Sequence, residues 1–200
     1  IGKLNVAKNI QIFENFVGDY CQEIINHVDN KDFAWYYFSN VQTYDYPPPS
    51  RLVCGFRHKL YNNDAPTSLY HYIAAPIISE IALKMNQEII SIVNAHVNLG
   101  LNLGEPFEGL PHIDANRVWG NDLELETETN KRFTAIYYID DSDGDTIFYG
   151  DDKVEIFRVS PQKDKCVVFK TNIMHSGSLP TKHNIRRVLN INLLMKEKND

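Results

Sequence analysis

The sequence has few cysteines and no excess of positive charge. Only three of its 200 residues are cysteines, Cys21, Cys54 and Cys166, and their wide spacing gives neither a disulfide framework nor a C-x-x-C metal site. Lysine and arginine number 20 against 26 aspartates and glutamates, a formal net charge of −6. The chain therefore lacks a broad basic face for a phosphate backbone, and we expect no nucleic-acid partner. The cysteines are expected to be free thiols in a reducing compartment.

Long apolar runs are also missing. No stretch approaches the ~20 apolar residues that span a bilayer, and residues 1–6 lack the basic-then-apolar pattern of a signal peptide. Hydrophobic residues still make up 43% of the chain, enough for a sizeable core. The composition predicts a soluble, cytoplasmic protein without a membrane partner. We expect a single domain over residues 1–200, with helical support and early strands in 1–90 and the main β core in 91–196.

Two segments of the first half have helical periodicity, residues 18–28 and 68–90. Their apolar positions each follow one helix face: Cys21, Ile24, Ile25 and Val28 in the first segment, and Ile73, Ile77, Ile81 and Met85 in the second. Asp19 and Gln22 are placed like a capping box. Between the two segments, residues 33–62 are rich in aromatics and are interrupted by a proline-rich loop at 46–50, which predicts short strands.

From residue 89 onward, short β-branched and aromatic runs alternate with glycine, aspartate, asparagine and proline. This pattern favours an antiparallel sandwich or barrel, with strands at 92–103, 133–139, 166–170 and 187–194. Residues 115–132, which include Trp119, are expected to form an edge hairpin or a mobile flap. Two helices followed by a β-domain of about 110 residues predict a helix-supported jelly roll.

The motif His112-Ile113-Asp114 is the first candidate site. A histidine and a carboxylate two residues apart on an extended segment point the same way and can bind one ion from one side. A second H-x-D, at His27 and Asp29, falls at the end of a predicted helix, where residues i and i+2 diverge, so it is not expected to chelate.

His175 is the expected third ligand, since it directly follows an apolar strand; His183 is a weaker rival. Two histidines and one carboxylate form the facial triad of non-haem Fe(II) oxygenases. Arg187 enters the last strand in phase with Leu189, Ile191 and Leu193, which predicts that it points into the barrel toward a bound anion. Arg186, in the opposite phase, is expected to face solvent. The other histidines, His58, His71 and His96, are expected to be hydrogen-bonded surface or core residues.

In this order, H-x-D at 112–114, His175 and Arg187 resemble the 2-oxoglutarate and Fe(II)-dependent oxygenases, most closely the prolyl-hydroxylase-like branch. The resemblance covers roughly residues 95–195 and includes the tyrosine strand at 136–139 and the glycine-containing entry to the next strand at 144–148. It implies a mainly β fold, a double-stranded β-helix of the jelly-roll or cupin-like type packed on N-terminal helices.

The resemblance also implies a dioxygenase that hydroxylates a peptidyl prolyl or other aliphatic C–H substrate and releases succinate and CO2. Its cofactors would be Fe(II), 2-oxoglutarate and O2, with ascorbate as a candidate accessory reductant. His112, Asp114 and His175 match the catalytic iron ligands. Arg187 and Tyr138 match the residues that share the distal carboxylate of 2-oxoglutarate. Asn102 stands where many members carry a tyrosine near the iron-bound end of the co-substrate.

This sequence departs from the family pattern at Asn102, at Asp145, where a second glycine is frequent, and in a longer segment after Asp114. That segment, residues 115–132, is hypothesised to be a lid over the site. Two other functions stay open at this stage. One is a non-catalytic jelly-roll protein that binds a metal or ligand, and the other is a jelly-roll metalloenzyme that does not use 2-oxoglutarate. The substrate could be a peptide or a small molecule.

Overall fold

The computed structural model describes residues 9–38, 54–114 and 130–198. The strands are β1 (Ile10–Phe13), β2 (Tyr36–Phe38), β3 (Gly55–Asn62), β4 (Ala65–Pro66), β5 (Gln87–Leu101), β6 (Asn130–Tyr138), β7 (Thr146–Tyr149), β8 (Glu155–Val159), β9 (Lys165–Lys170), β10 (His175–Gly177) and β11 (Ile185–Glu197). The helices are α2 (Gly18–Ile25) and α3 (Ala75–Lys84), with 3-10 turns η1 (Asn26–Asp29) and η2 (Leu69–Ala74). The proline-rich loop and Trp119 lie outside the described residues.

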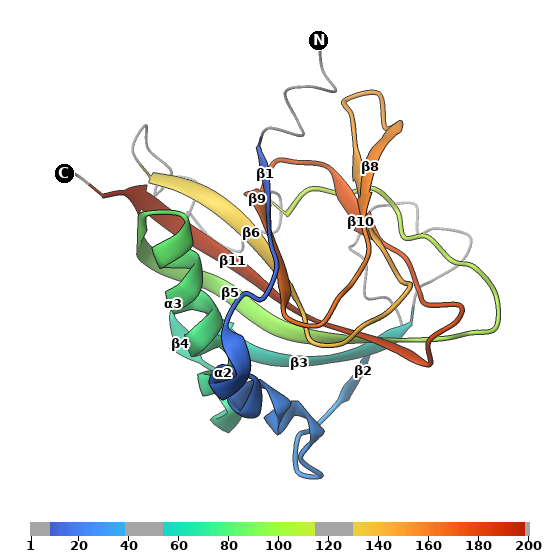
Figure 1. Ribbon diagram of the computed structural model, residues 1–200, viewed down its shortest axis with the longest axis horizontal. Helices are drawn as coiled ribbons and strands as arrows, with labels where there is room; N and C mark the ends of the chain where they lie inside the picture. The colour runs from blue at the N-terminus through green and yellow to red at the C-terminus, as the bar shows by residue number, and fades with distance from the viewer. Residues whose placement is uncertain (1–8, 39–53, 115–129, 199–200) are drawn as a thin grey trace.

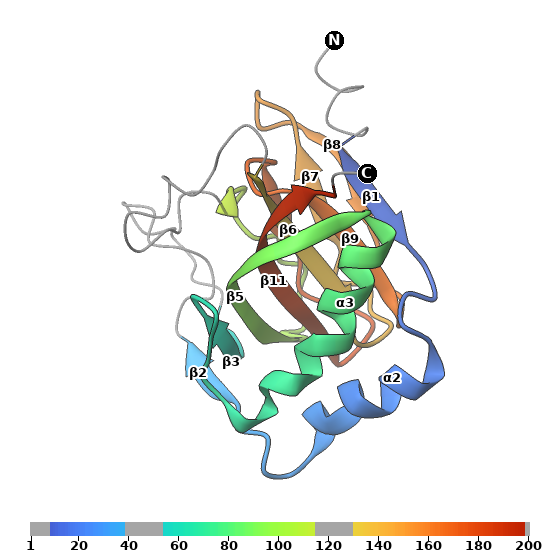
Figure 2. The same ribbon diagram turned by 90° about the vertical axis from the view of Figure 1, so that its left-hand side faces the viewer.

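The strands form two sheets that face each other (Figure 1). The large sheet has eight strands in the order β1-β9-β6-β11-β5-β3-β2, with β4 beside β3, and the small sheet has the order β10-β7-β8. In Figure 1, α2 and α3 lie at the lower left of the large sheet and β8 and β10 at its upper right. Figure 2 shows the helices in front of the large sheet. This arrangement confirms the predicted double-stranded β-helix on supporting helices.

Local sequence explains where α3 begins and ends. The Ser68 side chain accepts a hydrogen bond from the backbone N–H of Tyr70, and Pro76 sits in the first turn of α3, where its missing N–H costs nothing. Asn86 follows the helix with a φ of 50°, the left-handed conformation that commonly stops a helix. The helix therefore ends at Lys84, earlier than the periodicity predicts, and β5 begins at Gln87.

The start of α2 differs from the prediction. No side chain within the helix caps it, so the capping box of Asp19 and Gln22 is wrong. Asp164, on the loop between β8 and β9, accepts hydrogen bonds from the backbone N–H groups of Val17 at 3.0 Å and Gly18 at 3.3 Å. A carboxylate from a distant part of the chain thus satisfies the helix terminus, and local sequence spacing could not reveal it. Within the described residues, α2 and α3 fall short of the length and hydrophobicity that a membrane-crossing helix needs.

The core has two layers, one on each face of the large sheet. The layer beneath the helices contains fully buried side chains from α3 and from the three central strands: Ile77, Ile81, Ala95, Val97, Tyr137, Leu189, Ile191 and Leu193. The layer between the two sheets is smaller and contains Ile136, Tyr138, Phe148, Val167, Phe169 and Val188. Because side chains alternate along a strand, the second layer shares its face with the polar residues of the same strands.

Candidate metal centre and pocket

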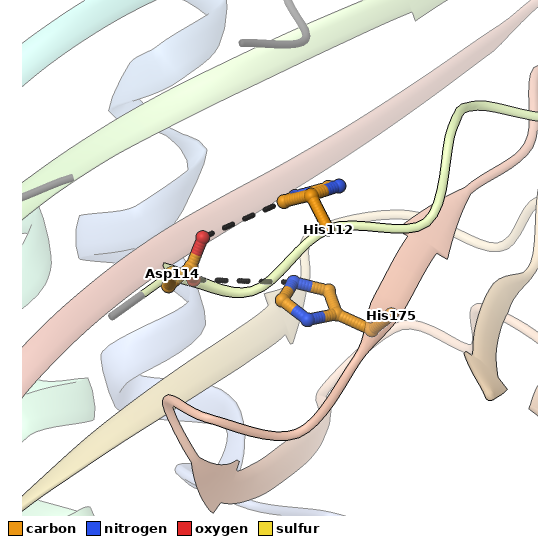
Figure 3. Close-up of side chains that lie close together, drawn as sticks. All are labelled: His112, Asp114 and His175. Atoms are coloured by element: carbon orange, nitrogen blue, oxygen red, sulfur yellow. Dashed lines mark ion pairs between the residues drawn. The ribbon is translucent and has the colours of Figure 1, made fainter. Parts of the chain in front are cut away.

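Three side chains converge between the two sheets: His112, Asp114 and His175 (Figure 3). Their ligand atoms all lie within 4.8 Å of one another, and each histidine Nε2 is 3.9 Å from a carboxylate oxygen of Asp114. The backbones of His112 and His175 exchange two hydrogen bonds of 2.9 Å, which fixes the two imidazoles side by side. A further bond, from the Asp114 N–H to the Thr171 carbonyl at 3.0 Å, places the carboxylate on the same side.

The hydrogen bonds of the two histidines determine which ring nitrogen is available. The Nδ1 of His112 lies 3.0 Å from the carbonyl oxygen of Leu110, and the Nδ1 of His175 lies 3.0 Å from that of Ile173. A carbonyl oxygen only accepts, so each Nδ1 carries a proton, which leaves the Nε2 of each ring as the nitrogen that can bind a metal ion. Both Nε2 atoms face the Asp114 carboxylate, so two imidazoles and one carboxylate are directed at the same point, as a metal ion requires.

The carboxylate of Asp114 is held from behind by two polar side chains. Its Oδ2 accepts hydrogen bonds from Thr134 Oγ1 at 2.9 Å and from Asn192 Nδ2 at 3.0 Å. Asn192 also donates to Thr134 at 2.9 Å, so the three side chains form a closed network, and all three are buried. Such bonds fix the orientation of a ligating carboxylate.

The centre opens into a pocket lined by residues of β3, β5, β6, β7, β10 and β11. Besides His112 and His175, its polar lining residues are Arg57, His96, Asn98, Thr146, Ser176, Ser178, Arg186 and Asn190, and its larger apolar ones are Leu99, Ile136, Leu179 and Val188. His96 was predicted to be a surface or core residue without a site role, and the structure places it in the pocket wall. Its alternation with Asn98 and Gly100 was the signal that could have placed it there.

Arg186 points into this pocket, contrary to the prediction that it faces solvent. Its Nε donates to the Gly144 carbonyl at 2.5 Å, and its Nη2 donates to Thr146 Oγ1 at 3.0 Å. A Cβ atom at Gly144 would lie 2.7 Å from the Arg186 Cδ, so only glycine leaves room for this side chain.

Arg186 forms no ion pair with a carboxylate among the described residues; burial lowers the pKa of its guanidinium, and the charges of Tyr138 and Asp145 oppose this shift. A buried cation without a counter-ion is costly unless an anion binds beside it.

Arg187 points the other way, so its predicted inward orientation is wrong. Its guanidinium pairs with Asp140, at 2.6 Å from Nε and 2.8 Å from Nη2, and also with Asp29. These hydrogen bonds raise the pKa of Arg187 above its usual value. The phase with Leu189, Ile191 and Leu193 was read correctly, but that face of β11 packs on the helices instead of lining the barrel.

Tyr138 and Asn102 are placed differently from each other. Tyr138 is fully buried on the pocket side of β6, and its hydroxyl donates to Thr146 Oγ1 at 2.7 Å. Burial raises its pKa to about 12, so the hydroxyl stays protonated.

Asn102 lies past the end of β5 and donates to the backbone carbonyls of Thr181 and His183 at 2.9 and 3.1 Å. It ties two loops together and is not among the residues that line the pocket, and its contact with a co-substrate stays a prediction.

The remaining histidines lie apart from the metal centre. His183, the rival ligand, is exposed and hydrogen-bonded to Asp143 at 2.9 Å. His27 contacts the Tyr72 hydroxyl, and Asp29 pairs with Arg187, so the second H-x-D is occupied by structural contacts. His58 and His71 are hydrogen-bonded, as predicted. Within the described residues, His112, Asp114 and His175 are the one group of three or more such side chains that could hold a metal.

The donor set fits Fe(II). Two neutral imidazoles and one carboxylate on one side of an ion leave its other positions open for substrates, and they are the ligand types that non-haem iron prefers. Residues 115–129 of the hypothesised lid lie outside the described residues, and residues 130–132 begin β6.

Comparisons with known proteins agree with this geometry. Residues 99–194 match the model of the 2OG-Fe(II) oxygenase superfamily. A prolyl hydroxylase from Trichoplax adhaerens, solved with a fragment of the hypoxia inducible factor oxygen degradation domain, is 15% identical, with a TM-score of 0.58 over 98% of this chain and 87% of its own. A prolyl-4-hydroxylase from Pseudomonas putida is 13% identical, with a TM-score of 0.56 over 97% of this chain and 99% of its own.

A third structure, an oxidoreductase of the 2OG-Fe(II) oxygenase family from Burkholderia pseudomallei, is 11% identical, with a TM-score of 0.63 over 100% of this chain and 92% of its own. At these identities the likeness concerns the fold. The search of curated protein sequences gave no match.

Proposed function

We propose that this chain, which belongs to the 2OG-Fe(II) oxygenase superfamily, hydroxylates an aliphatic C–H bond of a peptidyl proline or of another peptide or small-molecule substrate. The family uses Fe(II), 2-oxoglutarate and O2, and releases succinate and CO2. The observation that carries the proposal is that Arg186, a half-buried arginine without an ion pair to a carboxylate among the described residues, lines the same pocket as His112 and His175.

The residues divide into two groups by what they would bind. His112, Asp114 and His175 would hold Fe(II) through two Nε2 atoms and a carboxylate oxygen. Arg186 would pair with the distal carboxylate of 2-oxoglutarate, because a guanidinium matches a carboxylate in shape and charge. When bound, iron and 2-oxoglutarate supply the oxidising chemistry that activates O2.

Thr146 and Tyr138 support Arg186 in this role. Thr146 Oγ1 accepts from both the Arg186 guanidinium and the Tyr138 hydroxyl, which orients it in the pocket wall. The Tyr138 ring centroid lies 5.9 Å from the Arg186 Cζ, close enough for a cation–π contact. The direct role predicted for Tyr138 on the co-substrate carboxylate is therefore replaced by a positioning role through Thr146 and Arg186.

The apolar part of the pocket has a separate task. Leu99, Ile136 and Val188 line the wall beside the metal ligands. Side chains of this kind keep bulk water away from the reacting centre and strengthen the pairing of Arg186 with a carboxylate. The chain thus contributes binding, orientation and exclusion of water.

An anaerobic titration tests the proposal. Metal-free protein receives Fe(II) and then 2-oxoglutarate while the visible absorption spectrum is recorded, and succinate is measured after O2 is admitted with ascorbate present. We expect a charge-transfer band that needs both additions, and its loss in His175→Ala. Iron binding without the band, together with no 2-oxoglutarate binding by calorimetry, would refute the proposal.

A further inference from the structure

The turn between β6 and β7, residues 139–145, is hydrogen-bonded to the segment that joins the metal centre to Arg186. That segment, residues 178–184, follows β10, which begins at the metal ligand His175, and precedes β11, whose second residue is Arg186. The path of the segment therefore sets where the guanidinium lies relative to the metal ligands. The proposed function assigns no role to any side chain of the turn.

The carboxylate of Asp143, within this turn, binds three consecutive residues of the segment. Its Oδ2 accepts hydrogen bonds from the backbone N–H groups of Thr181 at 3.0 Å and Lys182 at 2.9 Å, and from Thr181 Oγ1 at 2.7 Å. Its Oδ1 accepts from the backbone N–H of His183 at 2.9 Å and lies 2.9 Å from His183 Nδ1. Successive backbone N–H groups that converge on one anion form a nest, and here a side chain of the same chain fills it.

The charge of Asp143 strengthens these contacts. Burial acts to raise the pKa of Asp143, but the hydrogen bonds from His183 and Thr181 outweigh it and hold the pKa well below its usual range. The carboxylate is therefore ionised at neutral pH, and each of its hydrogen bonds is charge-assisted. A single exposed ion pair does little to order a loop, whereas several bonds to one ionised group fix consecutive residues of the backbone.

The residue after Asp143 contacts Arg186 directly. The Gly144 carbonyl accepts a hydrogen bond from Arg186 Nε at 2.5 Å. A Cβ atom at Gly144 would lie 2.7 Å from the Ser178 carbonyl oxygen as well as 2.7 Å from Arg186 Cδ, so Gly144 is enclosed between the arginine and the segment. The Ser178 N–H also donates to the Asp145 carbonyl at 2.9 Å. A shift of the turn against the segment would therefore displace the carbonyl that orients the guanidinium.

We propose that Asp143 is a positioning residue for 2-oxoglutarate: it holds residues 181–183 so that the Arg186 guanidinium keeps the orientation in which it pairs with the distal carboxylate. The inference rests on the proposed function, in which Arg186 binds that carboxylate. Asp143 is not among the residues that line the pocket, so it acts through Arg186 and not by contact with the co-substrate.

The charge of Asp143 by itself has the opposite effect on binding. A negative charge near the pocket repels a dicarboxylate, so its removal alone would tighten the binding of 2-oxoglutarate. Loss of the hydrogen bonds to residues 181–183 would weaken the same binding. The sign of the change in affinity therefore separates a positioning role from a simple effect of charge.

The affinity of the Fe(II) protein for 2-oxoglutarate, measured by calorimetry without O2, tests the proposal. Asp143→Ala should bind 2-oxoglutarate roughly 10-fold more weakly than the wild type, a difference typical of coupled residues in one hydrogen-bond network. Asp143→Asn keeps one acceptor oxygen, so its affinity should fall between those of Asp143→Ala and the wild type. The asparagine variant also decides the question where the alanine variant does not fold.

Asp141→Ala is the matched control. Asp141 lies two residues earlier in the same turn, carries the same charge, and accepts a hydrogen bond from the Lys163 backbone N–H at 2.8 Å. This variant should keep its 2-oxoglutarate affinity within about twofold of the wild type, as surface substitutions usually do. The affinity for Mn(II), followed by electron paramagnetic resonance, should be the same in Asp143→Ala as in the wild type, because His112 and His175 fix each other through two backbone hydrogen bonds.

A second ligand shows whether the effect passes through Arg186. The compound 2-oxopentanoate has the keto acid end of 2-oxoglutarate and a methyl group in place of the distal carboxylate. Its affinity should be the same in Asp143→Ala as in the wild type, since it offers no anion to Arg186. For the same reason, adding Asp143→Ala to Arg186→Leu should cause no further loss of 2-oxoglutarate affinity.

Two results would overturn the proposal. One is that Asp143→Ala and Asp143→Asn bind 2-oxoglutarate as tightly as the wild type or more tightly. The other is that Asp143→Ala loses affinity for 2-oxoglutarate and 2-oxopentanoate equally, which would mean that Asp143 supports the fold and not Arg186. Failure of the wild-type protein to bind 2-oxoglutarate with Fe(II) would be a different result, since it would remove the proposed function itself.

Discussion

The two faces of β11 are covered by different parts of the molecule. On one face Leu189, Ile191 and Leu193 are fully buried against the helical layer. On the other face Arg186, Asn190 and Asn192 point between the two sheets, toward the metal centre and its pocket. The more apolar face of a strand is therefore the one beneath the helices, and the barrel interior is the more polar one. One face of β11 thus contributes to the hydrophobic core, and the opposite face contributes side chains to the metal centre and its pocket.

The same division appears at two adjacent arginines. Arg187, on the helix side, pairs with Asp140 and Asp29, whereas Arg186 bonds neutral oxygens of Gly144 and Thr146. A cation with carboxylate partners already has its counter-ions, and a half-buried cation that forms no ion pair can accept an anionic ligand. The carboxylates beside Arg187, and their absence from the hydrogen bonds of Arg186, support the proposal that Arg186 is the arginine that binds a ligand.

A cavity on the helix side should affect stability alone. Ile191→Ala removes a fully buried side chain, so the free energy of unfolding should fall by about 2–5 kcal/mol. Urea denaturation measures this loss. The affinity of the folded variant for Fe(II) and 2-oxoglutarate, measured at low temperature, should not change. A variant that keeps its stability but loses metal binding would contradict the division between the faces.

A substitution on the pocket side should lower the affinity for the metal before it lowers stability. Asn192→Ala removes the 3.0 Å hydrogen bond to Asp114 Oδ2, and loss of such a bond typically lowers metal affinity by roughly 10- to 100-fold. Titration with Mn(II), followed by electron paramagnetic resonance, measures the affinity. Asn102→Ala serves as the control, because Asn102 bonds only to loop backbone in the contacts seen here. Equal metal affinities of the two variants would show that Asn192 does not position the ligand.

Alkaline pH should lower the free energy of unfolding, because a tyrosine side chain of β6 is buried on each face of the large sheet. Burial raises the pKa of Tyr138 to about 12, and burial together with Asp164 raises that of Tyr137. Unfolded tyrosine titrates near 10, so above that pH the unfolded state releases protons that the folded state keeps. The free energy of unfolding is therefore unaffected by these tyrosines below pH 10. Above pH 10, and up to the pKa of each tyrosine in the folded state, it declines by about 1.4 kcal/mol per pH unit for each tyrosine.

Urea denaturation at pH 9 and pH 11 measures this decline. Tyr138→Phe, which removes one of the two groups, should reduce the decline by roughly 1.4 kcal/mol over the unit above pH 10. An unchanged decline in Tyr138→Phe would mean that this hydroxyl is ionised as easily in the folded protein as in the unfolded chain.

Local sequence patterns predicted the elements but not which layer covers each face. The alternation of Leu189, Ile191 and Leu193 correctly placed these residues on one face of a strand. It could not say that helices cover that face, because the helices come from residues 18–25 and 75–84, far earlier in the chain. The sequence analysis assumed that the apolar face lines the barrel, and it therefore assigned to Arg187 the inward orientation that Arg186 has.

The metal ligands were easier to predict than the pocket. His112 and Asp114 are two residues apart on one extended segment, so their shared direction is a local property. His175 follows a recognisable strand, and the family resemblance supplied the order. Thr134 and Asn192 were missed because their contact with Asp114 depends on the register between β6 and β11, which no local pattern contains.

The affinity for 2-oxoglutarate of two single variants tests the central claim most directly. Fe(II)-loaded Arg186→Leu and Arg187→Leu are titrated with 2-oxoglutarate under anaerobic conditions by calorimetry. The account predicts that Arg186→Leu binds 2-oxoglutarate at least about 30-fold more weakly, as expected when a buried charge loses its partner, while Arg187→Leu keeps wild-type affinity and loses only stability. The reverse result, weak binding by Arg187→Leu and normal binding by Arg186→Leu, would contradict it.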